Sequence, residues 1–375
     1  MSLLSHSAQN KRLLGVDLFR GVSAYGVVLI HGLGELPRDE QALMISNFFV
    51  AFCVPYFLVA SFYFSSHLLL YKKPKNYLSS RIKRILVPYA IWSLIYFLAR
   101  CLGYLIGNKE SLQRLISDPV NIIFFGAAGV HLYFLPMLFC GTVVAILMVK
   151  ICRRFSLPFL MNFFLVSLSI FYVMNVSGND FILGEGIAFK QAFFLQFNYS
   201  FSQMFRVILV ILAWTIKCMP YIIFGIIINS PRIQQLLYSF SLNEQNITRG
   251  KLLIIFFTPL GIISIFLCHS DILNLLIPYL SFLYSIGISG LISQNQTMTH
   301  IAKKLGYLSY GIYLSHALIT AGFLPIMTKL YPQIVSFQLS PLILIISSLV
   351  IFFVSLAIAH LFSLHQTTAR ILLAV

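Results

Sequence analysis

Charged residues, and acidic ones above all, are scarce in this sequence. Only 10% of its 375 residues are charged, with 10 Asp and Glu against 26 Lys and Arg. So few charged groups cannot cover the surface of an ordinary soluble domain, and 59% of the residues are hydrophobic, with a mean hydropathy of +0.89. The composition therefore excludes such a domain and predicts an all-α polytopic membrane protein.

Motifs for metal binding and disulfide bonding are missing as well. The six cysteines are scattered through or beside apolar segments, without a C-x-x-C pair. We expect them to be buried apolar side chains, and we expect no metal site. A small-residue cleavage site is also missing after the first apolar stretch, which favours a retained first helix over a signal peptide.

What the chain has instead is a series of long apolar segments. Ten of them are long enough to cross a bilayer as helices, at residues 14–34, 43–69, 85–107, 130–149, 157–175, 206–229, 252–269, 273–293, 304–326 and 341–363. We expect residues 1–375 to form one transmembrane domain without an appended soluble domain. With the loops assigned alternately to the two sides, most Lys and Arg residues fall on the side of the N-terminus. Basic residues favour cytoplasmic loops, so both termini are predicted to be cytoplasmic and the net charge of +16 does not indicate a nucleic-acid partner.

The first span carries ionisable residues that a membrane helix normally avoids. Asp17 and Arg20 lie near its cytoplasmic start, and His31 lies near its outer end. Such groups are costly inside a bilayer and are therefore functional candidates. At about 100° per residue, Arg20 and His31 share one helix face and stand about 16 Å apart along the axis. The simpler alternatives are an Asp17–Arg20 ion pair at the membrane edge and a structural His31 bonded to a neighbouring helix.

A pair of arginines precedes the third span. Arg81 and Arg84 form an R-x-x-R motif in the loop that follows the second span. Planar guanidinium groups suit bidentate binding of phosphate. A basic cluster beside a span can equally be a topology anchor, and both interpretations stay open at this point.

Three further residues are candidates, and two of them, Glu35 and His131, are predicted to lie on the outer side. Glu35 follows His31 by four residues and could fix the tautomer of its imidazole, or it could be a solvated loop carboxylate. His131 opens the fourth span at the predicted level of His31. His316 lies inside the ninth span, within the stretch GYLSYGIYLSH.

Together these patches resemble the acyltransferase-3 family of integral membrane acyltransferases. The resemblance rests on D-x-x-R leading into R-x10-H, on R-x-x-R before the third span, and on the His-Leu-aromatic-Phe-Leu stretch of the fourth. MPYIIFGIII in the sixth span and LSYGIYLSH in the ninth add to it. In the second span, CVPYFLVASFYF departs from the Ser-Gly pair that family members often have. The residues that carry the resemblance are Asp17, Arg20, His31, Arg81, Arg84 and His131.

The resemblance implies a stand-alone, acyl-CoA-dependent O-acetyltransferase of the bacterial inner membrane. Acetyl-CoA would be its co-substrate, with no permanently bound cofactor, and membrane lipid its surroundings. The acceptor would be a hydroxyl of a surface glycan or a lipid-linked glycan. We expect lipopolysaccharide O-antigen, with capsule, peptidoglycan and small glycolipids as alternatives.

The resemblance and the predicted topology also suggest a role for each candidate residue. Arg20, Arg81 and Arg84 would hold the anionic donor on the cytoplasmic side, with Asp17 as the partner of Arg20. His31 would act as general base toward the acceptor, with Glu35 holding the imidazole and His131 among the candidates for stabilising the oxyanion. His316 is a further candidate.

Two alternatives to this mechanism remain. His31 could itself carry the acetyl group as a covalent intermediate. The chain could also be a transporter or flippase of a lipid-linked or anionic sugar, with Arg20 and His31 lining the path. The lack of clear inverted repeats and the position of Arg81 and Arg84 in a loop argue against a transporter.

Overall fold

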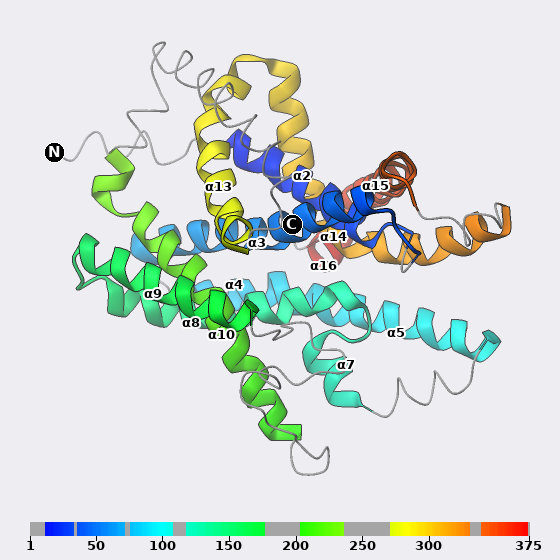
Figure 1. The fold of residues 1–375 in the computed structure, drawn as a ribbon, viewed down its shortest axis with the longest axis horizontal. Helices are drawn as coiled ribbons and strands as arrows, with labels where there is room; N and C mark the ends of the chain where they lie inside the picture. The colour runs from blue at the N-terminus through cyan, green and yellow to red at the C-terminus, as the bar shows by residue number, and fades with distance from the viewer. Residues whose placement is uncertain are drawn as a thin grey trace.

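The protein is a bundle of helices in all the parts that the structure describes. The computed structural model describes residues 12–33, 36–71, 76–107, 118–176, 203–235, 271–330 and 339–373. No β-strand occurs within these ranges, although an isolated bridge joins Arg38 to Leu339. The elements are α2 (Leu14–His31), α3 (Glu40–Tyr71), α4 (Tyr77–Arg81), η2 (Ile82–Leu86), α5 (Val87–Gly107), α7 (Pro119–Phe125), η3 (Val130–Tyr133), α8 (Phe134–Cys152), α9 (Leu157–Val176), α10 (Gln203–Ile228), α13 (Asp271–Gln294), α14 (Gln296–Leu330), α15 (Pro341–Ser363) and α16 (Gln366–Leu372) (Figure 1).

The predicted all-α polytopic membrane architecture is confirmed. Within the described ranges, eight helical segments are long and apolar enough to cross a membrane, and they correspond to eight of the ten predicted spans. The predicted span 252–269 lies outside the described residues. The span 304–326 falls within α14, which is helical but is not among those eight segments.

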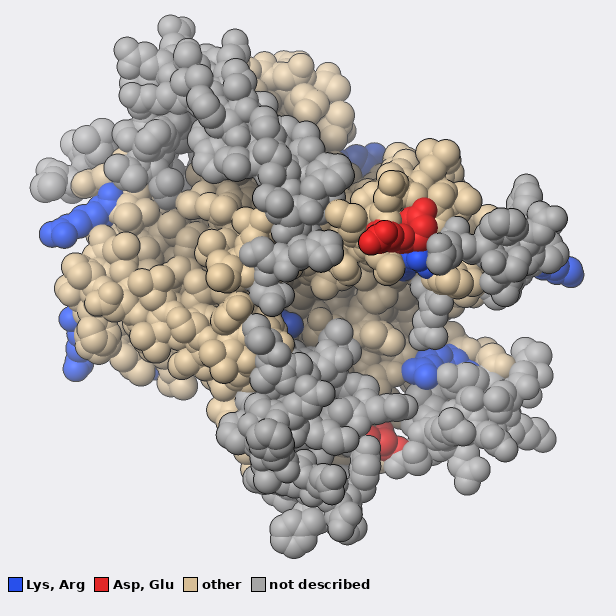
Figure 2. All heavy atoms as spheres, viewed as in Figure 1, with Lys and Arg blue, Asp and Glu red and all other residues tan. Residues whose placement is uncertain are grey.

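The outer surface of the bundle is apolar, as a lipid-facing surface must be. Uncharged residues dominate the described surface on the face in Figure 2, with few Lys, Arg, Asp or Glu side chains among them. Large hydrophobic side chains such as Leu94, Leu102 and Phe353 are more than half exposed. In water such a surface would be unfavourable, whereas in a bilayer these side chains contact lipid chains of the same polarity.

The helix α2 is the most buried of the eight membrane-spanning segments. It packs against α3, α13, α14 and α15. Small residues allow this close packing, because a Cβ atom on Gly15 would collide with the Ser285 carbonyl of α13, and one on Gly26 would collide with Cys53 of α3. The surroundings of α2 are therefore made by four other helices.

Contacts along α2 fix the directions of its two main neighbours. Phe19 packs on Tyr56, whereas Tyr25 packs on Phe49, so α3 runs antiparallel to α2. Toward α14, Asp17 lies against Gly306 and His31 lies near His316, so these two helices run in the same direction. We call the Asp17 end of α2 the arginine end and the His31 end the histidine end.

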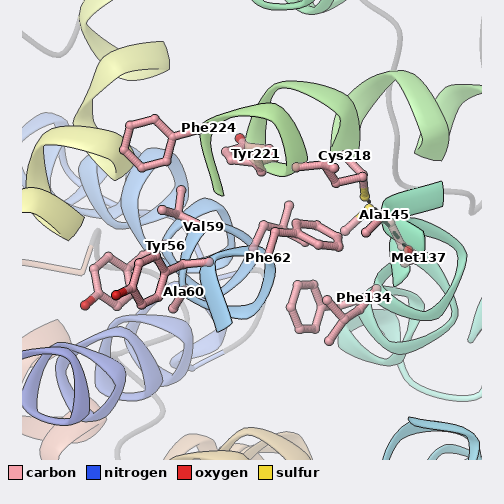
Figure 3. Close-up of a cluster of buried hydrophobic side chains, with 14 of the residues drawn as sticks. Tyr56, Val59, Ala60, Phe62, Phe134, Met137, Ala145, Cys218, Tyr221 and Phe224 are labelled. Carbon is pink, nitrogen blue, oxygen red and sulfur yellow. Dashed lines mark hydrogen bonds between the residues drawn. The ribbon is translucent and has the colours of Figure 1, made fainter. Parts of the chain in front are cut away.

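Aromatic and aliphatic side chains fill the core on the other side of α3. Phe62 of α3 meets Met137 and Ala145 of α8 and Cys218 of α10 in one buried cluster (Figure 3). Among the described residues, Cys53, Cys152 and Cys218 are buried free thiols. Their burial agrees with the prediction of small buried apolar side chains, whereas Cys101 and Cys140 are only partly buried.

The third span begins earlier than predicted. Helical structure starts at Tyr77 in α4 and continues through a π-helical turn, Ile82–Leu86, into α5. Arg81 and Arg84 therefore lie on a helix, and their predicted position in a loop is wrong. The argument against a transporter that used this loop position no longer holds.

Candidate active site

Three histidines from three separate elements meet at the histidine end of α2. His31 is the last residue of α2, His131 lies in η3, and His316 lies within α14. Their ring centroids are 4.8 Å apart for His131 and His316, 5.4 Å for His31 and His316, and 6.4 Å for His31 and His131. The predicted common level of His31 and His131 is confirmed. We call these three residues the histidine cluster.

Burial differs within the histidine cluster. His316 is 0% exposed and His131 is 3% exposed, whereas His31 is only partly buried. A molecule that approaches from outside the bundle therefore reaches His31 before the other two imidazoles. His31 is the accessible member of the cluster.

The hydrogen bonding of His316 defines its tautomer. Its Nδ1 lies 2.7 Å from the carbonyl oxygen of Tyr313, and because a carbonyl can only accept, Nδ1 must carry the proton. In the neutral ring, Nε2 then has a free lone pair. This Nε2 and both ring nitrogens of His131 are buried and form no hydrogen bond of good geometry within the described part of the chain. Buried polar atoms normally have partners, so water or a substrate would satisfy these nitrogens.

Two tyrosines surround the buried histidines, and sequence reasoning missed both. The Tyr313 hydroxyl donates to the main-chain carbonyl of His131, and its ring lies 5.5 Å from that of His131. The ring of Tyr96, from α5, packs edge-on against His131 at 5.0 Å. The spacing of Tyr313 and His316, three residues apart on one helix, was a usable signal. Tyr96 is on a different helix, and its sequence neighbours give no such signal.

Arg38 holds the end of α2 that carries His31. Its Nη2 donates to the carbonyls of Ile30 at 2.8 Å and Gly32 at 3.3 Å, and its Nη1 donates to Ser46 Oγ at 2.7 Å. Carbonyls at a helix C-terminus lack intrahelical partners and attract cations, so this guanidinium stabilises the helix end. Sequence reasoning missed this role, because in the sequence Arg38 is one of three adjacent charged residues in a loop.

The backbone just after His31 reverses in an unusual conformation. Leu33 has a φ of 56°, in the left-handed region that residues other than glycine rarely adopt, and its side chain is completely buried. Packing around Leu33 therefore helps to fix where α2 ends. Glu35, the predicted partner of His31, lies outside the described residues.

At the arginine end, Asp17 forms ion pairs with two arginines. Arg20 Nη1 lies 3.8 Å from Asp17 Oδ1, which confirms the pairing of residues three apart, and Arg12 Nε binds Asp17 Oδ2. Arg12 also donates to the Lys303 carbonyl at 3.2 Å. Asp17 itself is 7% exposed. Two cations share one carboxylate, so this group of three residues is net positive.

The two arginines of the R-x-x-R motif have different surroundings. Arg81 donates to Tyr77 Oη at 3.0 Å and to Ser65 Oγ at 3.3 Å, and its guanidinium lies 5.0 Å from the centre of the Tyr77 ring. Arg84 lies on the π-helical turn and is exposed. Neither forms an ion pair with a carboxylate in the described ranges. Ser65 is nearer than Tyr56 to the C-terminus of the antiparallel α3, which locates Arg81 on the arginine side of Tyr56.

The described residues offer no obvious metal site. No group of three or more His, Cys, Asp or Glu side chains within these ranges could hold a metal ion. The groups that the structure places at the histidine cluster are imidazoles, tyrosine hydroxyls and main-chain groups. Proton transfer and hydrogen bonding to a developing charge are the reactions that such groups support.

A bundle of apolar helices with buried histidines at one end and arginines at the other defines the class as a helical membrane protein with an internal polar site. Residues 13–360 match the model of the acyltransferase-3 family, which is described as "Acyltransferase domain". The chain therefore belongs to this family and is a membrane acyltransferase. No curated protein and no solved structure gave a significant match to the chain.

Proposed function

We propose that this protein moves an acetyl group from cytoplasmic acetyl-CoA to a hydroxyl of a surface polysaccharide. We expect the acceptor to be lipopolysaccharide O-antigen, modified on the outer side of the bacterial inner membrane. The observation that carries this proposal is the arrangement along α2, with unpaired arginine charge near one end and the histidine cluster at the other. The family membership favours acyl transfer over the transporter alternative.

The arginine end suits the donor. Acetyl-CoA carries several phosphate charges, and guanidinium groups bind phosphate with charge-assisted hydrogen bonds. Arg81 has Tyr77 and Ser65 as neutral partners, so its positive charge is available to an anion. Arg84 is exposed, and Arg20 is held by the shared carboxylate of Asp17. In this proposal all three arginines bind the donor, with Asp17 as the support of Arg20.

The histidine end suits the acceptor, with His31 as the general base. As the acceptor oxygen attacks the thioester carbonyl, its O–H bond breaks and His31 takes the proton. The new C–O ester bond forms, the C–S bond breaks, and the imidazolium returns the proton to the departing thiolate. His31 is assigned this step because it is the accessible imidazole of the cluster.

The other two histidines have supporting roles in this proposal. An N–H of the buried His131 would donate to the oxyanion that develops on the acyl carbon. The free lone pair of His316 Nε2 would accept a hydrogen bond from His31 and so orient it. Glu35 remains a second predicted partner for His31. In the alternative route, His31 would carry the acetyl group covalently before the acceptor arrives.

The direct test follows radiolabelled acetyl groups. Purified protein in lipid nanodiscs is incubated with labelled acetyl-CoA and with isolated lipopolysaccharide that bears O-antigen. We expect label in the glycan, and trapping of label on the protein without acceptor would favour the covalent route. A folded protein that transfers no label to O-antigen, capsule, peptidoglycan or glycolipid would contradict the proposal.

A further inference from the structure

The hydroxyl of Tyr96 hydrogen-bonds to two backbone groups of α14 that lie four residues apart. In a regular α-helix the N–H of residue 318 donates to the carbonyl of residue 314. Here Tyr96 Oη donates to the Leu314 carbonyl at 2.8 Å and accepts from the Leu318 N–H at 3.1 Å. A phenol has one proton to donate and lone pairs to accept, so one hydroxyl satisfies both groups. Tyr96 is itself 5% exposed, so this bridge is buried.

The turn that Tyr96 bridges is the turn that carries His316. Residues 314 and 318 lie two positions before and two positions after this histidine. The same tyrosine packs its ring edge-on against His131 at 5.0 Å. One side chain of α5 therefore touches the backbone around one buried histidine and the ring of another.

We infer that Tyr96 is a positioning residue that sets the placement of His131 and His316 within the histidine cluster. This inference rests on the proposed acyl transfer at that cluster. Without the hydroxyl, the Leu314 carbonyl and the Leu318 N–H would lose the partner that they share in α5. The turn would no longer be tied to α5, and His316 would move relative to His31 and His131. Displacements of about 1 Å at a reacting centre cost about 100-fold in rate.

The chain offers a matched control for the loss of a tyrosine hydroxyl. Tyr89 lies on the same helix, α5, and is 7% exposed. Its hydroxyl donates to the carbonyl of Ile123 at 2.8 Å in α7, so it too bridges α5 to a neighbouring backbone. Tyr89→Phe and Tyr96→Phe remove the same atom from similarly buried sites. Of these two tyrosines, only Tyr96 contacts the backbone turn that carries His316.

The kinetic test compares kcat and KM of the two variants in nanodiscs. We expect Tyr96→Phe to lower kcat by about 10- to 100-fold and to leave the KM for acetyl-CoA within about twofold. Tyr89→Phe should leave both quantities within about twofold. Equal losses of kcat in the two variants, or a rise in KM alone, would overturn the inference. Thermal unfolding of both variants checks that each is folded.

A second measurement separates this inference from the proposed function. Hydrogen–deuterium exchange of the peptide that contains Leu318, and diethyl pyrocarbonate labelling of His131 and His316, are followed by mass spectrometry. Both should change in Tyr96→Phe and not in Tyr89→Phe, and unchanged signals would overturn the inference. Wild-type transfer with a fully active Tyr96→Phe variant would refute only the role of Tyr96. If the wild type transfers no acetyl label, the proposed function fails instead.

Discussion

The two ends of α2 differ in how their polar groups are held. At the histidine end, imidazoles from three elements are packed within 6.4 Å of each other, and two of them are buried among aromatic rings. At the arginine end the groups are charged, and although Asp17 is buried, Arg20 and Arg81 are only partly buried and Arg84 is exposed. A reacting centre needs fixed geometry in a water-poor site, whereas capture of a large anion needs charge that the ligand can reach. The contrast fits the proposed mechanism, in which chemistry takes place at the histidine end and donor binding at the arginine end.

The largest expected effect comes from removing the accessible imidazole. His31→Ala should lower kcat by about 10²- to 10⁴-fold, the usual contribution of a general base, while the KM for acetyl-CoA stays nearly constant. The measurement is labelled acetyl transfer at saturating donor. His360→Ala, an exposed histidine on α15, is the matched control and should stay fully active. Retained transfer in a folded His31→Ala variant would end the assignment of chemistry to this end.

The second-largest expected effect comes from removing an arginine side chain at the arginine end. Arg81→Ala should raise the KM for acetyl-CoA about 10- to 100-fold with little change in kcat, since a charge-assisted hydrogen bond contributes about 1.5–3 kcal/mol. Arg84→Ala should have a smaller effect, because among the described residues no side-chain partner such as Ser65 or Tyr77 orients the exposed Arg84 in advance. Initial rates at varied donor concentration give both constants, with the exposed Arg154→Ala as control. An unchanged donor KM would remove the binding role from this end.

The smallest expected effect is on stability. Asp17→Asn should lower the free energy of unfolding by about 1 kcal/mol, because both ion pairs of Asp17 are weakened. The expected loss of stability is modest, since the side chains of Arg12 and Arg20 remain 48% and 33% exposed to solvent. Thermal unfolding in detergent would measure it, with the exposed Glu40→Gln as control. A loss as large in Glu40→Gln would show that the Asp17 ion pairs carry no special weight.

Relationships within one helix were accessible from the sequence. The pairing of Asp17 with Arg20 follows from their spacing of three residues, and the observed distance is 3.8 Å. The positions of Arg20 and His31 toward opposite ends of the first span follow from the rise of about 1.5 Å per residue. One relationship between two spans, the common level of His31 and His131, also follows from the sequence, through the predicted order of spans. Each of these predictions depends only on helix geometry and hydropathy.

Helix geometry and hydropathy did not predict two local features, which are the start of helical structure before the third span and the cap at the end of α2. The sequence does not predict the start of helical structure at Tyr77, because Arg81 and most of its neighbours are polar, which favours a loop. A helix can continue past the hydrophobic part of a span, since its backbone hydrogen bonds are internal. The cap that Arg38 forms on the last turn of α2 was missed because it depends on the path of the loop. Polarity alone did not mark either boundary.

By itself, the sequence determined that this is a helical membrane protein, which residues are ionisable within its spans, and which of them share a helix face. Only the tertiary structure decided that His316 joins His31 and His131, and that Tyr96 of α5 bridges the turn of α14 beside it. The physical reason is that spacing along one helix follows from its fixed period. Contacts between helices depend on how their side chains pack, which no single period encodes.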